Sequence, residues 1–313
     1  MSKDIKYIFL GGTYRGHQLF SSLVKKNILP EYVFITEEDE HEEIKYAERL
    51  QTICEEKKIP HRVCKKLSKK DYKLISKDQW DFGIVCVWRT LIDAEVTKYF
   101  KAGLIAAHDS LLPEYRGFAP LNWAIINGEK KTGVTLFQIR EGEMDSGPVL
   151  NQIEVMIGEN DYAIDVHKKV AQATIAAYEN FILDFKSDSW TVKEQDEKKA
   201  TYTCKRTPKD GKIIWDKSSK TVFNLIRALA PPYPCAFCVY DGKVFHIRKA
   251  RLGKNDQKKF VGRIPGRVIN MQPEGIEVLC GEGTILIEEW EEKTSGEIDT
   301  PSNKIKSITG ILK

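Results

Sequence analysis

The sequence predicts an α/β fold in which an open, Rossmann-like parallel sheet is followed by a small β-rich domain. Its first half alternates short apolar runs, rich in β-branched residues, with amphipathic stretches, which is typical of a parallel sheet covered by helices on both faces. After Phe185 the pattern changes to short alternating segments separated by turns such as Asp241-Gly242 and Glu274-Gly275. We therefore predict one domain over residues 1–200 and a second, OB-like domain over residues 201–313.

The elements of the first domain follow from its apolar periodicity. Six apolar runs have the length of buried strands, at residues 5–10, 32–35, 82–88, 104–107, 134–139 and 149–155. Three stretches between them carry helical spacing, at residues 18–26, 44–56 and 94–100. A longer helical pattern follows, with apolar positions from Val166 to Phe185, and we expect it to close the domain.

The elements of the second domain are shorter. Alternation of apolar and polar residues predicts strands at residues 245–247, 268–271 and 276–279. A helical pattern at residues 219–229 precedes these strands. A partial barrel with one helix in front of it is the arrangement we expect.

Composition excludes several classes of protein. The chain is 42% hydrophobic, yet no apolar run approaches the roughly 20 residues that span a bilayer. Its polar start lacks the apolar core of a signal peptide, and its seven cysteines have no framework spacing, which suits a reducing compartment. A net charge of +4, from 49 basic and 45 acidic residues, does not favour a nucleic-acid partner. We expect a cytoplasmic protein without membrane association, in which any anion site is local.

Two short motifs have simple structural explanations. The loop GGTYRG at residues 11–16 could hold an anion at a helix N-terminus, but its spacing is not G-x-G-x-x-G, and the acidic run at residues 37–43 would repel a dinucleotide phosphate. Tight-turn glycines are the better explanation, with Arg15 as a candidate ligand contact. The C-x-x-C at residues 235–238 has no second pair of ligands nearby, so we expect no metal site.

The most informative stretch runs from residue 106 to residue 150. His108 comes at the carboxyl end of a predicted strand, where ligands bind in open α/β sheets, and Asp145 lies just before a Gly-Pro turn. A carboxylate that holds an imidazole fixes its tautomer and raises its pKa, so the two residues could form an acid–base pair. From spacing alone, a structural histidine and a turn-forming aspartate are the commoner explanations.

This stretch resembles the folate-dependent formyltransferase family, which includes methionyl-tRNA formyltransferase, sugar N-formyltransferases and related hydrolases. The family pattern N-x-H-x-S-L-L-P-x-Y-R-G reads AAHDSLLPEYRG at residues 106–117. Further matches lie at Pro120 and at residues 123–125, 132–135 and 145–147. The second domain is most similar to that of nucleotide-sugar N-formyltransferases, at residues 206–208, 214–215, 224, 226–229 and 232–237.

The resemblance implies a role for each matching position. His108 and Asp145 are the implied catalytic residues, and Ala106 occupies the place of a family Asn that holds the oxyanion together with the His. N10-formyltetrahydrofolate is the implied co-substrate, with contacts at Trp88, Arg89, Leu91, Leu112, Pro113 and Met144. The implied nucleotide-sugar contacts are Arg15, Tyr115, Arg116, Arg206, Thr207, Trp215, Asn224, Arg227 and Tyr233. Arginines paired with surface carboxylates, and aromatic rings that pack a domain junction, are the structural alternatives at these positions.

Ala106 is the departure from the family pattern. A methyl group donates no hydrogen bond, and loss of one oxyanion donor typically costs about 10²- to 10³-fold in rate. Three explanations remain open: a natural loss of activity, compensation by Asp109 or Ser110, and a deliberate substitution that traps substrates. We expect an intact binding site with impaired chemistry.

The expected acceptor is the amino group of a sugar linked to UDP or dTDP, in surface polysaccharide or glycan biosynthesis. A transfer-RNA enzyme needs a basic surface to bind phosphates. The resemblance places a basic insertion of the transfer-RNA enzymes after the second strand, whereas this chain has its acidic run there, at residues 37–43. A methionyl-tRNA formyltransferase, an inactive nucleotide-sugar-binding protein and a Rossmann-type oxidoreductase are the alternatives. Any homodimer is expected to form through the β-rich domain.

Overall fold

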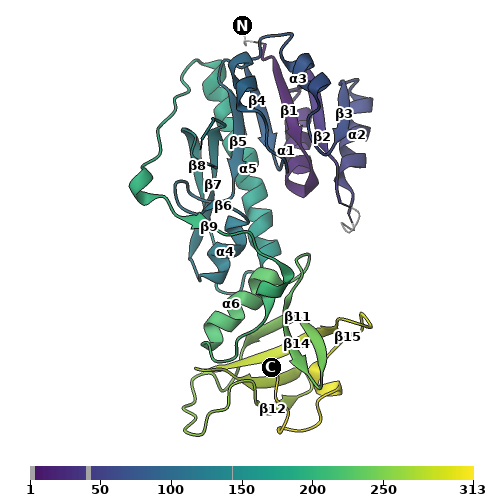
Figure 1. The fold of residues 1–313 in the computed structure, drawn as a ribbon, viewed down its shortest axis with the longest axis vertical. Helices are drawn as coiled ribbons and strands as arrows, with labels where there is room; N and C mark the ends of the chain where they lie inside the picture. The colour runs from purple at the N-terminus through teal and green to yellow at the C-terminus, as the bar shows by residue number, and fades with distance from the viewer. Residues whose placement is uncertain (1–3, 40–43, 143) are drawn as a thin grey trace. The chain divides into compact units, whose positions relative to one another are not determined.

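A computed structural model of the chain describes residues 4–39, 44–142 and 144–313 (Figure 1). The chain divides into two compact units, which we call unit 1 and unit 2. Unit 1 contains residues 1–117, 133–155 and 169–202. Unit 2 contains residues 203–313 together with two segments from the first half of the chain, 118–132 and 156–168.

Unit 1 is built on a seven-stranded sheet with the order β3-β2-β1-β4-β5-β7-β8 (Figure 1). Its strands are β1 (Tyr7–Gly11), β2 (Tyr32–Thr36), β3 (His61–Cys64), β4 (Phe82–Cys86), β5 (Leu104–His108), β7 (Lys131–Gln138) and β8 (Val149–Met156). The first five strands of this order pair in parallel, as predicted. β7 pairs with β5 in antiparallel register, with Thr135 opposite His108.

The predicted open parallel sheet is confirmed for these five strands, and at this edge the sheet is mixed. A parallel neighbour needs a crossover connection, usually a helix packed on the sheet. In the fully described connection between β5 and β7, the one α-helix is α4 (Pro120–Ile126), and it belongs to unit 2. With no helix crossing the sheet of unit 1, the chain returns antiparallel.

Helices cover both faces of this sheet. On one face lie α1 (Thr13–Lys25) and α5 (Ala163–Lys186), and the Tyr178 hydroxyl of α5 lies 3.1 Å and 2.9 Å from the carbonyl oxygens of Val85 and Ile105. α2 (Tyr46–Glu56) packs beside α1 through the Tyr14 and Tyr46 rings. The opposite face packs against α3 (Lys69–Ile75) and a short 3₁₀ helix, η1 (Ala94–Tyr99). Sequence periodicity predicted an ordinary helix at η1 and missed β3, α3 and α4.

Unit 2 contains a separate antiparallel sheet with the order β10-β11-β14-β13-β12, and β15 (Ile298–Asp299) pairs with β14. Its main strands are β10 (Ala236–Tyr240), β11 (Lys243–Leu252), β12 (Val268–Gln272), β13 (Gly275–Leu279) and β14 (Thr284–Glu292). α6 (Ser219–Leu229) buries Val222, Phe223 and Ile226. The expected β-rich architecture is confirmed. Among the described residues, no helix has both the length and the apolar character needed to cross a membrane.

Candidate active site

The loop between β1 and α1 is shaped by close packing. A side chain on Gly11 would collide with the Cys86 carbonyl oxygen, and one on Gly12 would lie 2.8 Å from Thr36 Cβ. Both glycines are therefore explained by the narrow space between the strands, as expected for a tight turn. Arg15, in the first turn of α1, is buried and forms an ion pair with Asp109.

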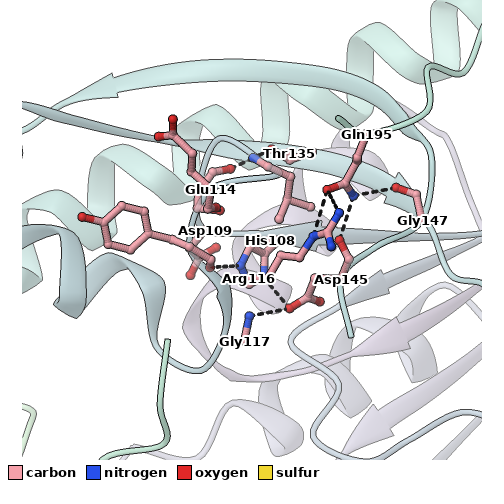
Figure 2. Close-up of polar contacts among 12 residues, drawn as sticks. His108, Asp109, Glu114, Arg116, Gly117, Thr135, Asp145, Gly147 and Gln195 are labelled. Atoms are coloured by element: carbon pink, nitrogen blue, oxygen red, sulfur yellow. Dashed lines mark hydrogen bonds and ion pairs between the residues drawn. The ribbon is translucent and has the colours of Figure 1, made fainter. Parts of the chain in front are cut away.

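His108 ends β5 and lies beside Asp145 (Figure 2). Its Nδ1 is 3.5 Å from Asp145 Oδ2, and its Nε2 is 2.9 Å from the carbonyl oxygen of Tyr115. The Gly117 amide donates a hydrogen bond of 2.9 Å to the same Asp145 oxygen. Because β5 pairs in parallel with β4, and β4 pairs in parallel with β1, this pair stands at the carboxyl edge of the central strands, where open α/β sheets bind ligands.

The surroundings of His108 set its proton affinity. Burial lowers its pKa, and the positive charge of Arg15 acts in the same direction, whereas the Asp145 carboxylate and the Tyr115 carbonyl raise it. A carbonyl oxygen only accepts hydrogen bonds, so Nε2 carries a proton and Nδ1 faces the carboxylate. The contact between Nδ1 and the Asp145 carboxylate is attractive when a second proton lies on Nδ1 or on the carboxylate. The pair can therefore take up or release one proton, as general acid–base chemistry requires.

Ala106 lies on the same face of β5 as His108, because side chains alternate along a strand and the two residues are two positions apart. Neither expected substitute for the missing amide is placed to donate to an oxyanion. Asp109 is paired with Arg15, and a carboxylate accepts hydrogen bonds. The Ser110 hydroxyl is buried and donates to the Glu114 carbonyl at 2.6 Å.

The residues expected to contact folate have mixed surroundings within unit 1. Leu112 is buried, and the bond to Pro113 is cis. Arg89 forms an ion pair of 3.2 Å with Asp39. Leu91 is 91% exposed and Met144 is 49% exposed, which leaves both available to cover an apolar ring. Trp88 packs against the cluster formed by β-strands, α3 and η1. Folate binding by these six residues stays a prediction.

Arg116 does not have the surroundings of a ligand-binding cation. Its side chain is fully buried, and its five N–H donors are all directed at neighbouring side chains. Nε and Nη2 donate to Gln195 Oε1, and Nη1 and Nη2 donate to the Glu197 carboxylate at 2.8 Å each. Nη1 also donates to the Tyr202 hydroxyl. The guanidinium thus holds the segment after α5, and its expected contact with substrate stays a prediction.

A pocket in unit 2 brings together three of the residues expected to bind the nucleotide sugar, Arg206, Thr207 and Tyr233. Its volume is ≈ 320 Å³. The Arg206 guanidinium lies over the Trp123 ring at 5.7 Å, and Lys205 lies over Phe118 at 6.0 Å. Burial lowers the pKa of Arg206, with Asp210 acting in the opposite direction. Lys205 and Arg206 thus place two positive charges beside aromatic rings at one pocket. Such a pocket suits an anionic ligand that also carries a flat apolar group.

Three other expected substrate contacts of unit 2 lie elsewhere. Arg227 is buried, donates through Nε to Asn224 Oδ1 at 2.9 Å, and donates through Nη1 to the carbonyls of Gly158 and Asp161. These bonds hold the segment 156–168, so Asn224 and Arg227 have structural roles. Trp215 is also buried, with its ring against the backbone at Gly266. Substrate contacts by these three residues stay a prediction.

Sequence reasoning also missed residues that complete these arrangements. Gln195 and Glu197 lie in the polar stretch after α5, and Lys205 lies next to Arg206. Their place next to matching segments was the one indication in the sequence. It was not decisive, because a polar stretch of this kind is usually solvated. In the part of the chain that the structure describes, no group of three His, Cys, Asp or Glu side chains could hold a metal ion.

Comparison with known families agrees with this arrangement. The profile described as formyl transferase matches residues 6–182, and the profile of its C-terminal domain matches residues 205–303. The chain belongs to the formyltransferase family. The motif that resembled this family, including His108 and Asp145, lies inside the first match.

Solved structures of formyltransferases share the fold. An N-formyltransferase from Helicobacter canadensis, in complex with folinic acid and dTDP-3-aminofucose, is 19% identical with a TM-score of 0.71 and matches 91% of this chain and 99% of its own. WlaRD, a sugar 3N-formyltransferase in the presence of dTDP and 5-N-formyl-THF, is 19% identical with a TM-score of 0.67, over 94% of this chain and 99% of its own. HypX from Aquifex aeolicus in complex with tetrahydrofolic acid is 18% identical with a TM-score of 0.67, over 98% of this chain. This formyltransferase spans about half of HypX, 48% of that chain.

Proposed function

We propose that this formyltransferase moves a formyl group from N10-formyltetrahydrofolate to the amino group of a sugar linked to UDP or dTDP. The observation that carries the proposal is the His108–Asp145 pair, 3.5 Å apart at the carboxyl edge of the sheet, within a chain of this family. Two structures of the same fold contain a folate derivative together with dTDP or a dTDP-sugar, which supports the choice of both substrates.

His108 and Asp145 handle the proton in the proposed reaction. When the acceptor amine attacks the formyl carbon, the nitrogen becomes cationic and must lose a proton, which the pair can take up. The bond between the formyl carbon and N10 then breaks, and the same proton can pass to N10 of the leaving tetrahydrofolate. Nε2 donates to the Tyr115 carbonyl and Nδ1 faces Asp145, so the protonated imidazole donates to the oxyanion only after the bond to Tyr115 is exchanged. Because Ala106 supplies no second donor, we propose that the chain binds both substrates and transfers the formyl group slowly.

The pocket of unit 2 is our candidate for the nucleotide part of the acceptor. Lys205 and Arg206 supply positive charge for a pyrophosphate, and Tyr233 supplies an aromatic ring for a base. The test is calorimetry with tetrahydrofolate and a panel of UDP- and dTDP-linked amino sugars, followed by mass spectrometry of the sugar after incubation with 10-formyltetrahydrofolate. Binding of an amino sugar with gain of one formyl group is expected, and His108→Gln should bind without turnover.

Three alternatives have distinct outcomes in the same series of experiments. Salt-sensitive binding of initiator transfer RNA at physiological salt would favour the transfer-RNA reaction. Sugar binding without any detectable formyl transfer, in the parent and in Ala106→Asn, would favour an inactive binding protein. Thermal stabilisation by NAD, with none by tetrahydrofolate, would favour an oxidoreductase.

A further inference from the structure

Gln195 joins two segments around the candidate active site through one amide group (Figure 2). Its Oε1 accepts from Arg116 Nε at 3.1 Å and from Nη2 at 2.8 Å. Its Nε2 donates to the carbonyl oxygens of Asp145 and Gly147, at 2.7 Å each. The side chain therefore links the strand that follows the His108 loop to the loop that carries Asp145.

We infer that Gln195 is a positioning residue for formyl transfer, which holds Asp145 against His108 by fixing the Asp145 backbone. The inference rests on the proposed function, in which this pair handles the proton. The contacts form a closed circuit, because Gly117, next to Arg116 in the chain, donates its amide to Asp145 Oδ2. Gln195 links Arg116 to the main chain of Asp145, and Gly117 links Arg116 to the side chain of Asp145.

The backbone at Asp145 needs such a restraint. Asp145 has a φ of 56°, in the left-handed region, which is unfavourable for a residue with a side chain. Only surrounding contacts keep a residue in this conformation. The two bonds from Gln195 hold the backbone directly after this position, since they reach the carbonyls of Asp145 and Gly147.

The chemistry of the link requires a neutral amide. An amide both accepts and donates, whereas a carboxylate only accepts and an ammonium only donates. Gln195 meets a guanidinium on one side and two carbonyl oxygens on the other, so no charged side chain can satisfy both sides. Glu197 supports the first side alone, with two contacts to Arg116 of 2.8 Å each.

The test uses the full-length protein and the variant Gln195→Met, which retains an unbranched side chain of similar length and loses these hydrogen bonds. The matched control is Gln138→Met, because Gln138 Nε2 donates to the Ala102 carbonyl at 2.9 Å and that bond involves neither Asp145 nor Arg116. Thermal unfolding of both variants shows whether they are folded.

The first measurement is an NMR titration of His108 with isotopically labelled histidine, in the absence of substrates. Asp145 raises the pKa of His108, while burial and Arg15 lower it, so loosening of Asp145 shifts the titration midpoint downward. The expected shift in Gln195→Met is about 1 pH unit, with none in the control. The second measurement is turnover, in the Ala106→Asn chain if the parent is slow. We expect kcat about tenfold lower, with KM for both substrates nearly unchanged.

A folded Gln195→Met variant with the parent's titration midpoint overturns the inference, whatever its turnover. A chain that shows no formyl transfer at all contradicts the proposed function and leaves the titration result standing. If Gln195→Met does not fold, Gln195→Glu retains the acceptor for Arg116 and loses both donors. Amide hydrogen exchange at Gly117 should then be faster than in the parent, and an unchanged rate overturns the inference.

Discussion

At the scale of single residues, Ala106 is the position with the largest expected effect on rate. Ala106→Asn places an amide on the face of β5 that carries His108, where it can donate to the oxyanion. We expect turnover to rise about 100-fold, with KM little changed, because the new contact strengthens mainly in the transition state. Steady-state kinetics with 10-formyltetrahydrofolate and the amino sugar found by calorimetry measures both quantities.

Ala107→Asn is the matched control for this change. Residue 107 lies on the opposite face of β5, so an amide there should leave turnover unaltered. A parent chain that is already fast, and that Ala106→Asn does not improve, would show that another group holds the oxyanion.

His108 predicts a pH dependence of stability. Burial lowers its pKa below the ordinary value of about 6.5, so the unfolded chain binds a proton at this residue more readily than the folded chain. Stability contributed by neutral His108 is therefore present above pH 6.5 and is lost as pH falls through 6.5 toward the folded pKa. Urea unfolding at about pH 5.5 and about pH 7.5, roughly one unit either side of that value, should show a smaller loss of stability in His108→Gln than in the parent. An equal loss in both proteins would contradict the prediction.

The sequence motif located the pair that we propose to react, His108 and Asp145, but could not separate ligand contacts from supporting residues. His108 and Asp145 lie together because the motif records a local arrangement of strand end and loop. Arg116 and Arg227 belong to matching segments for a different reason, since their guanidinium groups hold backbone and side chains of their own unit. A cation in a motif looks the same in both roles, and only its partners distinguish them.

At the scale of elements, apolar periodicity predicted the central strands and left out those with polar sequences. β1, β2, β4 and β5 are continuous apolar runs because helices cover both of their faces. β3, with the sequence HRVC, lies at the edge of the sheet and has few apolar positions. The direction of β7 could not be predicted, because periodicity is the same in parallel and antiparallel strands.

The pocket of unit 2 gives a prediction for the segment 205–211, which lines it. Arg206→Ala removes the cation over Trp123 and should raise KM for the nucleotide sugar by about tenfold or more, with KM for the folate unchanged. Lys220→Ala, on exposed α6 surface outside the pocket, is the charge-matched control. Equal effects of the two substitutions would mean that the pocket does not bind the pyrophosphate.

At the scale of the whole molecule, the chain passes between its two units five times, after residues 117, 132, 155, 168 and 202. A fragment of residues 1–202 therefore contains two segments of unit 2 without the rest of that unit. In the fragment, Asn122 Nδ2 loses the Ala228 carbonyl, and the carbonyls of Gly158 and Asp161 lose Arg227. Each buried polar group left without a partner costs about 1–3 kcal/mol.

We expect fragment 1–202 to unfold at a clearly lower temperature than the full chain, or without a cooperative transition. Calorimetry of the fragment and of the full chain at equal concentration measures the difference. Co-expression with residues 203–313 should restore part of the loss, because the missing partners of Asn122, Gly158 and Asp161 lie in that piece. A fragment that melts like the full chain would show that segments 118–132 and 156–168 do not depend on the remainder of unit 2.

The same interweaving limits how such a gene can recombine. A single exchange at residue 203 that brings in the carboxyl-terminal part of another formyltransferase places foreign residues against Asn122 and against the Gly158 and Asp161 carbonyls. The acceptor for Asn122 is a main-chain carbonyl that any residue at position 228 supplies, so the requirement on the donor is a guanidinium at the place of Arg227. New acceptor specificities are therefore expected to arise by point substitution in the pocket-lining stretch from Lys205 to Gly211, with the remainder of the second unit inherited together with its first-half segments.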